Sequence, residues 1–354
     1  SIDWSAELNQ ARELDTRDPL AAFRDEFLFP QGGAGGARAG RDLLYFAGNS
    51  LGLQPRRARR YIEEELEDWQ RFGVEGHVRA RHPWLPYHEF LTENLARIVG
   101  AKPTEVVAMN TLTVNLHLMM VSFYRPTRER YKILIESGAF SSDQYAVASQ
   151  ADFHSRQVGF DPKQAVVELR PRDGEDCLRD EDILAAIERE GPQLALVLIG
   201  NVNYLTGQAF DMKAITARAR SVGASVGFDL AHGVGSLELS LHDCAPDFAV
   251  WCSYKYLNSG PGALGGCFVH ERHHRDISLP RFAGWWGQNK TTRFQMGPVF
   301  DPIPTVESWQ LSNPPIFQLA AMRASFEIFD SATLPRLRQK SVSLIGLLER
   351  LLKA

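Results

Sequence analysis

The stretches VGFDLAHGVG (residues 226–235) and WCSYKYLN (residues 251–258) decide the fold. Each opens with an apolar run of strand length and ends in a reactive group, Asp229 in the first and Lys255 in the second. Ligands of open parallel sheets bind at the carboxyl ends of the strands, so we expect this carboxylate and this amine to face one site. A buried carboxylate and a buried amine are costly unless they pair or serve a function.

Similar apolar runs recur along the chain, separated by amphipathic stretches. The expected strands are 131–135, 194–199, 224–228, 248–252 and 264–269, and the expected helices are 112–124, 142–150, 179–190 and 212–222. This alternation predicts an α/β fold with a mainly parallel sheet covered by helices on both faces. The flanking predictions are a helix over 4–28, a glycine-rich loop at 32–40, a strand-like run at 43–46, a helix from Pro55 to 72, and helices over 314–354.

Composition narrows the class of protein. A chain of 354 residues that is 44% hydrophobic buries a large core and would usually form two domains. The net charge of −4 argues against a nucleic-acid partner or an anionic membrane surface. The four cysteines form no C-x-x-C pair, and no signal peptide or membrane-spanning run is evident. We therefore expect a cytoplasmic protein without a nucleic-acid or membrane partner.

The segment Gly48-Asn49-Ser50-Leu51-Gly52 matches the G-x-S-x-G pattern of a serine-hydrolase nucleophile elbow. In such an elbow the helix begins almost at the serine, whereas here the helical pattern starts only near Pro55. Asp229 and His232, the best acid and base, also lie on one short segment and would not easily both reach Ser50. A serine esterase thus remains the less favoured alternative, and a simple turn is the preferred interpretation.

Residues 270–274 read HERHH and match the zinc motif H-E-x-x-H. That motif places two histidines on one face of a helix, but here it follows directly on an expected strand. We expect a solvated loop at this position and no metal in the protein.

Lys255 and Asp229 match what pyridoxal 5'-phosphate (PLP) requires of a protein. The lysine forms the Schiff base, and the carboxylate keeps the pyridine nitrogen protonated. On these two residues alone, a buried ion pair without cofactor is equally compatible. The surroundings favour the cofactor: NTLTVNLH (110–117) places threonines at a helix start suited to phosphate, and GAFSSD (138–143) offers an aromatic ring beside hydroxyls and a carboxylate.

With these residues in view, the sequence resembles the kynureninase family, fold-type I PLP enzymes related to class V aminotransferases. The matching stretches occur in family order from about residue 45 to 345: FAGNSLGLQP, EELEDW, NTLTVNLH, ESGAFSSDQYA, YLTGQ, VGFDLAHGVG, WCSYKYLNSGPG, GWWG and LSNPPI.

The resemblance implies a role for each matching position. Catalytic roles fall to Lys255, Tyr254 and Asp229. The cofactor contacts implied are Leu112, Thr113, Phe140, Ser141, Ser142, Asp143, Asp229, His232, Tyr254, Lys255, Trp285 and Asn313. The substrate contacts implied are Ser50, His77, Trp285, Trp286 and Asn313. Trp285 and Asn313 would reach the site of a neighbouring subunit, which implies a homodimer.

The family reaction is the hydrolytic cleavage of the Cβ–Cγ bond of L-kynurenine or 3-hydroxy-L-kynurenine. Its products are anthranilate or 3-hydroxyanthranilate and L-alanine, in tryptophan catabolism and NAD biosynthesis. His77 and Asn313 are polar groups able to meet a ring hydroxyl, so the 3-hydroxy substrate is one hypothesis. A cysteine desulfurase-like or aminotransferase activity on the same cofactor, and a relative without catalysis, remain alternatives.

The implied domains are an N-terminal helical segment with a substrate loop (1–75), a large PLP-binding α/β domain (76–305), and the start of a smaller C-terminal α/β domain (306–354), which we expect to be incomplete. The arginine that binds the substrate carboxylate in the family lies beyond the matching region. Arg323, Arg336, Arg338 and Arg350 are present, but none stands in the matching context and none is assigned.

Overall fold

The computed structural model describes residues 3–32 and 40–353, so most of the predicted glycine-rich loop lies outside the described residues. Within them, a seven-stranded sheet has the order β3-β9-β8-β7-β6-β4-β5. Its strands are β3 (Val106–Ala108), β4 (Lys132–Glu136), β5 (Val166–Leu169), β6 (Leu194–Gly200), β7 (Ser225–Asp229), β8 (Phe248–Cys252) and β9 (Gly265–Val269). Only β9 runs antiparallel to its neighbours, so the predicted mainly parallel sheet is confirmed.

Both faces of the sheet are buried. Along β6 and β8, successive side chains enter alternate hydrophobic clusters: Val197 and Trp251 join one, and Leu198 and Val250 join the other. Such two-sided burial explains why these strands are continuous apolar runs in the sequence. Packing on both faces therefore fixes the position of the carboxyl ends of the central strands.

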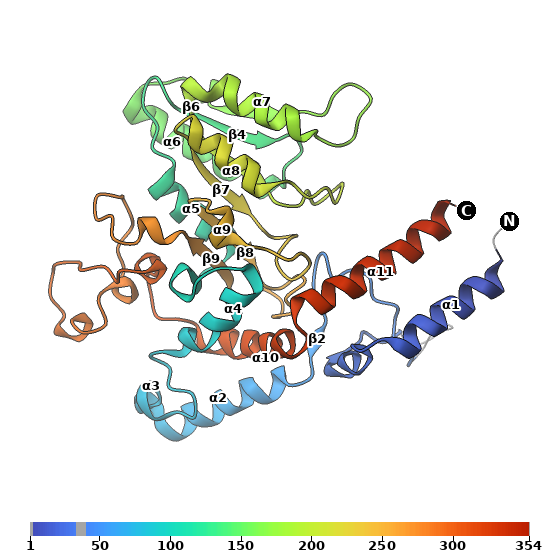
Figure 1. The fold of residues 1–354 in the computed structure, drawn as a ribbon. Helices are drawn as coiled ribbons and strands as arrows, with labels where there is room; N and C mark the ends of the chain where they lie inside the picture. The colour runs from blue at the N-terminus through green and yellow to red at the C-terminus, as the bar shows by residue number, and fades with distance from the viewer. Residues whose placement is uncertain (1–2, 33–39, 354) are drawn as a thin grey trace.

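Helices cover the two faces, and Figure 1 shows the sheet enclosed between them. The helices are α1 (Trp4–Arg17), α2 (Ala58–Phe72), α3 (Gly76–Arg79), α4 (Thr92–Val99), α5 (Leu112–Phe123), α6 (Ser141–Val158), α7 (Asp180–Glu190), α8 (Met212–Ser221), α9 (Leu241–Cys244), α10 (Ile316–Ala332) and α11 (Leu334–Lys353). The apolar residues of α5 join one cluster and those of α7, α8 and α10 join the other. The four helices predicted between strands are present, with α6 extending well beyond the predicted 142–150.

The N-terminal region departs from the sequence predictions. The expected helix over 4–28 ends at Arg17, and a 3-10 turn (Ala21–Glu26) precedes the short strand β1 (Phe27–Leu28). Residues 43–46 form no strand. Pro55 does not begin a helix but lies in β2 (Gln54–Pro55), which pairs antiparallel with β1, and α2 starts at Ala58. A long-range strand pairing has overridden the local preference of proline for a helix start.

The two ends of the chain lie side by side. Lys340 on α11 pairs with Asp18, and Arg350 contacts Glu7 and Gln10 on α1. Figure 1 shows α1 and α11 projecting together from the remainder of the molecule. The division of the chain at residues 75 and 305 remains a prediction. No helix within the described ranges is both long and apolar enough to span a membrane.

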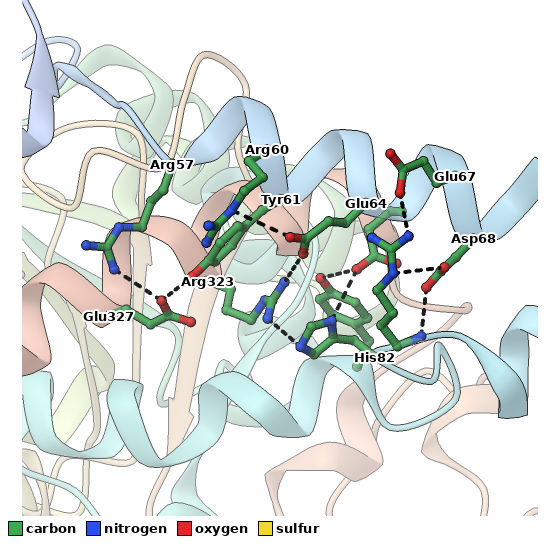
Figure 2. Close-up of polar contacts among 12 residues, drawn as sticks. Arg57, Arg60, Tyr61, Glu64, Glu67, Asp68, His82, Arg323 and Glu327 are labelled. Carbon is green, nitrogen blue, oxygen red and sulfur yellow. Dashed lines mark hydrogen bonds and ion pairs between the residues drawn. The ribbon is translucent and has the colours of Figure 1, made fainter.

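A buried polar network joins α2, α10 and the segment that follows α3 (Figure 2). The Arg323 guanidinium donates to His82 Nε2 at 2.6 Å and lies over the Tyr61 ring at 4.3 Å. The carboxylate of Glu65, only 1% exposed, accepts from Trp84 Nε1 at 2.9 Å and from the Tyr87 hydroxyl at 2.8 Å. Burial and the Arg323 charge lower the pKa of His82, so its neutral ring accepts from the guanidinium. The network fixes residues 76–87, which carry His77, against α2.

We predict that Arg323→Met destabilises the protein by about 3 kcal/mol, because it leaves buried partners of a charged group unpaired. The exposed i,i+4 pair of Arg59 with Glu63 provides the control, and Arg59→Met should change the unfolding free energy by less than about 0.5 kcal/mol. Urea unfolding of the two variants measures the difference. Equal effects of the two substitutions would show that the network contributes nothing beyond a surface pair.

Candidate active site

Asp229 and Lys255 line one cavity of about 220 Å³ at the carboxyl edge of the sheet. Asp229 ends β7, and Lys255 follows β8, which pairs with β7 in parallel. The remaining lining residues are Leu112, Thr113, Glu136, Phe140, Ser142, Asp143, Gly200, Val202, Tyr204, Ala231, His232 and Tyr254. The expectation that the acid and the amine face a common site is therefore met by the geometry.

The amine of Lys255 lies close to two aromatic rings, those of His232 and Phe140. Its Nζ lies 3.0 Å from His232 Nε2 and 5.7 Å from the centroid of the Phe140 ring. Burial and the Lys255 charge lower the pKa of His232 to about 4. The imidazole is thus neutral near pH 7 and can accept a hydrogen bond from the amine.

Two aspartates face the same cavity from different elements. Asp229 Oδ1 accepts from the Ala231 amide at 2.7 Å, while the buried Oδ1 of Asp143, on α6, has no hydrogen-bond partner. Burial raises the pKa of Asp229, and burial together with the negative charge of Asp229 raises that of Asp143. Burying such carboxyl groups costs free energy unless a hydrogen-bond donor or a cation pairs with them.

Hydroxyl groups and helix amides form another wall of the cavity. Thr113 Oγ1 lies 2.8 Å from Ser142 Oγ, which joins the first turn of α5 to the first turn of α6. The first amides of a helix lack intrahelical acceptors and favour anions such as phosphate. Burial raises the pKa of Tyr254 to about 12, so its phenol is a proton donor at neutral pH.

This donor set fits PLP. The unpartnered Asp143 oxygen and the buried Asp229 carboxylate suit a protonated ring nitrogen, and Lys255 offers the amine for covalent attachment. Phe140 can cover the ring, and Thr113, Ser142 and the α5 amides suit the phosphate. Ser141, also predicted as a contact, begins α6 without lining the cavity.

The other predicted contacts lie outside the cavity lining. Asn313 and Ser50 are exposed, and Trp285 is 39% exposed with its Nε1 donating to the Arg293 carbonyl at 3.2 Å. His77 is half-buried on α3, with its Nδ1 donating to the Val74 carbonyl at 2.9 Å. Trp286 is fully buried beneath the Arg293 guanidinium, so its ring faces no open surface for a substrate in this chain.

Residues 48–52 contact the loop after β8 that carries Lys255 and do not form a nucleophile elbow. The Gly52 amide donates to the Tyr254 carbonyl at 2.8 Å, and Asn258 Nδ2 donates to the Leu53 carbonyl at 3.2 Å. Neither the strand nor the helix of an elbow flanks Ser50, and Ser50 lies outside the cavity that holds Asp229 and His232. The preferred interpretation as a turn agrees with this geometry.

The histidines of the HERHH segment face separate partners. His273 Nε2 pairs with Asp247 at 2.8 Å, and His274 Nε2 donates to the Val269 carbonyl at 2.9 Å. His270 lies with His242 and Glu105, whose carboxylate already accepts from the amides of Lys102 and Glu271. The segment is a short 3-10 turn after β9, without a helix face to present two histidines together.

Two polar side chains that line the cavity were given no role from the sequence, Glu136 and Tyr204. Glu136 is the last residue of β4, one position beyond the predicted strand, so the rule for strand ends could have found it. Tyr204 lies on the loop after β6, with its ring 5.5 Å from that of Phe140. It begins the matching stretch YLTGQ, but no role was assigned to it from that stretch.

Fold and site together define a PLP-dependent enzyme of the class V aminotransferase type. The family model described as Aminotransferase class-V matches residues 62–354. Kynureninases from Myxococcus xanthus and Koribacter versatilis are 66% and 60% identical, each over 97% of this chain and over 78% and 79% of their own lengths. A third, from Flavobacterium psychrophilum, is 54% identical over 98% of the chain and 79% of its own length. The chain belongs to the kynureninase family.

Solved structures agree on the fold at much lower identity. A cysteine desulfurase from Thermococcus onnurineus superposes with a TM-score of 0.67 at 16% identity, covering 95% of this chain and 74% of its own. The cysteine desulfurase CsdA from Escherichia coli gives 0.68 at 16% identity, covering 97% and 77%. These similarities support the fold alone.

We predict that Gly52→Ala weakens PLP binding at least about tenfold, because its methyl group would clash with the Lys255 carbonyl oxygen and push the loop that carries Lys255 away. Gly48→Ala is the matched control, since nothing lies within 4 Å of the added carbon. Titration of each apoenzyme with PLP, followed by absorbance, measures the affinity. Equal affinities would mean that residues 48–52 do not position Lys255.

Proposed function

We propose that the protein hydrolyses L-kynurenine, 3-hydroxy-L-kynurenine or both at the Cβ–Cγ bond, releasing anthranilate or 3-hydroxyanthranilate and L-alanine. The observation that carries this proposal is the identity of 52–66% to several kynureninases over nearly the whole chain. The cavity that brings Lys255 and Asp229 together supports it independently. The reaction belongs to tryptophan catabolism.

The roles of the residues follow from their chemistry. Bound PLP supplies an electron sink that stabilises negative charge developing on the amino-acid substrate. Lys255 would hold the cofactor, and its amine would take the proton from the substrate α carbon. His232, neutral and 3.0 Å from Lys255 Nζ, orients that amine. Tyr254, protonated at neutral pH, donates a proton at the carbonyl of the side chain that is cleaved.

A cysteine desulfurase activity is less well supported. Such an enzyme uses a reactive cysteine thiolate, and none of the four cysteines lines the described cavity. Cys252 and Cys267 are buried, and burial raises the pKa of Cys252 to about 11. Cys177 is exposed, but it lies on the loop before α7.

We further propose a homodimer in which Trp285 and Asn313 complete the partner's site. Their exposure, away from the cavity of their own chain, is compatible with contact across an interface. We also place the protein in the cytoplasm, in agreement with its unpaired cysteines.

We expect the wild-type protein to form anthranilate and alanine from kynurenine, and Lys255→Ala to reduce this rate by roughly 10³-fold or more, because the amine both binds the cofactor and moves the proton. Fluorescence of anthranilate and an alanine assay measure the products, with 3-hydroxykynurenine tested in parallel. Lys102→Ala, an exposed lysine paired with Glu271, is the control and should retain the activity. Ester hydrolysis lost in Ser50→Ala, with Lys255→Ala unaffected, would contradict the proposal.

Mixing two inactive variants tests the shared site. Lys255→Ala and Asn313→Ala each disable both sites of their own homodimers, but a hybrid dimer retains one site with both native residues. Random exchange of subunits should therefore restore up to about a quarter of the wild-type activity. Activity that stays at the sum of the separate variants, although subunit exchange is demonstrated with labelled chains, would place Asn313 in its own subunit's site or in none.

A further inference from the structure

Glu136 is a buried carboxyl group in the cavity for which the site described so far has no role. It ends β4, is 5% exposed and lines the cavity together with Asp143 and Asp229. The Gly200 amide on β6 donates to both of its oxygens, at 3.2 and 3.3 Å. A side chain at Gly200 would crowd it, since an added Cβ would lie 3.0 Å from Glu136 Oε1.

The charges around Glu136 are mostly negative. Besides burial, the charge of Asp229 on β7 raises the pKa of Glu136, and the charge of Glu136 contributes to raising the pKa of Asp143 on α6. The Gly200 amide on β6 donates a hydrogen bond to Glu136. Among the described residues that line the cavity, Lys255 is the one lysine or arginine, and burial and the lysine charge keep His232 neutral. One amine therefore faces three carboxyl groups.

Burial and the charge of Asp229 raise the pKa of Glu136 to about 7. The group is consequently partly protonated near neutral pH. Its proton state must respond when the charge of Asp229 is neutralised, because that charge is one of the causes of the shift.

We propose that Glu136 is a positioning residue that balances charge in the site: it releases its proton to solvent when a protonated pyridine nitrogen pairs with Asp229. The carboxyl group becomes a carboxylate held by the Gly200 amide, and the ring cation is then compensated by more than one negative charge. The proposal rests on the proposed function, since it takes PLP as the ligand of the cavity.

Isothermal titration of apoenzyme with PLP at about pH 7 tests the proposal, in buffers of different ionisation enthalpy that contain no primary amine. Glu136→Gln should release fewer protons per site than wild type, by up to about 0.5, because a partly protonated carboxyl group has been removed. Glu168→Gln is the matched control: Glu168 on β5 pairs in register with Ile135 but has a partly exposed side chain. It should exchange as many protons as wild type.

The stability of the apoenzyme gives a second readout. The folded protein holds the Glu136 proton up to about pH 7, whereas the unfolded chain loses it near its ordinary pKa of about 4.5, so this stabilisation disappears as the pH rises through that interval. The Tm of Glu136→Gln relative to wild type should therefore increase between about pH 5 and about pH 8. Glu136→Asp, which keeps a titrating group, should retain part of the wild-type proton release.

The outcomes separate the two proposals. If wild type does not bind PLP, the proposed function fails. If wild type binds PLP and Glu136→Gln exchanges the same number of protons, the inference about Glu136 is wrong, even if the variant is less stable by the same amount at every pH. Should Glu136→Gln not fold, Glu136→Asp decides: a proton release smaller than that of wild type would support the proposal, and an unchanged release would overturn it.

Discussion

Buried negative charge at the carboxyl edge of the sheet is the constraint on which the rest of the site depends. Three carboxyl groups converge there from β4, α6 and β7: Glu136, Asp143 and Asp229. A low-dielectric site holds such groups only if they are protonated or paired, and Lys255 alone cannot neutralise all three. A ligand that carries a protonated ring nitrogen satisfies this need, so the electrostatics and the kynureninase relatives point to the same cofactor.

The lysine is held from outside the sheet as well. Residues 48–53 form hydrogen bonds with the loop on both sides of Lys255: the Gly52 amide donates to the Tyr254 carbonyl, and Asn258 Nδ2 donates to the Leu53 carbonyl. Asn258 adopts a positive φ of 54°. The same segment leads into β2 and α2, and the Arg323 network fixes α2 to α10 and to the residues around His77. The N-terminal region therefore contributes to the site by restraining its loop rather than by lining the cavity.

The sequence predicted those parts of the fold that local pattern determines. The five strands it indicated are long apolar runs because both of their faces are buried, whereas β3 has three residues and β5 includes the exposed Glu168. The pairing of β2 with β1 depends on contacts between residues 28 positions apart in register, such as Phe27 and Pro55, which no local pattern encodes. Asp229 and Lys255 were found because strand ends mark ligand sites, and Glu136 was missed because the predicted strand stopped one residue early.

Two neighbouring residues implied only by the family resemblance, Trp285 and Trp286, differ in their exposure. Trp286 is completely buried, with the Arg293 guanidinium 4.2 Å from its ring, while the adjacent Trp285 is 39% exposed. Neighbouring positions in a 3-10 turn point in different directions, so one indole can anchor the turn while the other projects from it. In the proposed homodimer this arrangement would give Trp285 a fixed orientation towards the partner. The buried Trp286 thus anchors the turn that carries Trp285, and the motif of two tryptophans presents one exposed indole.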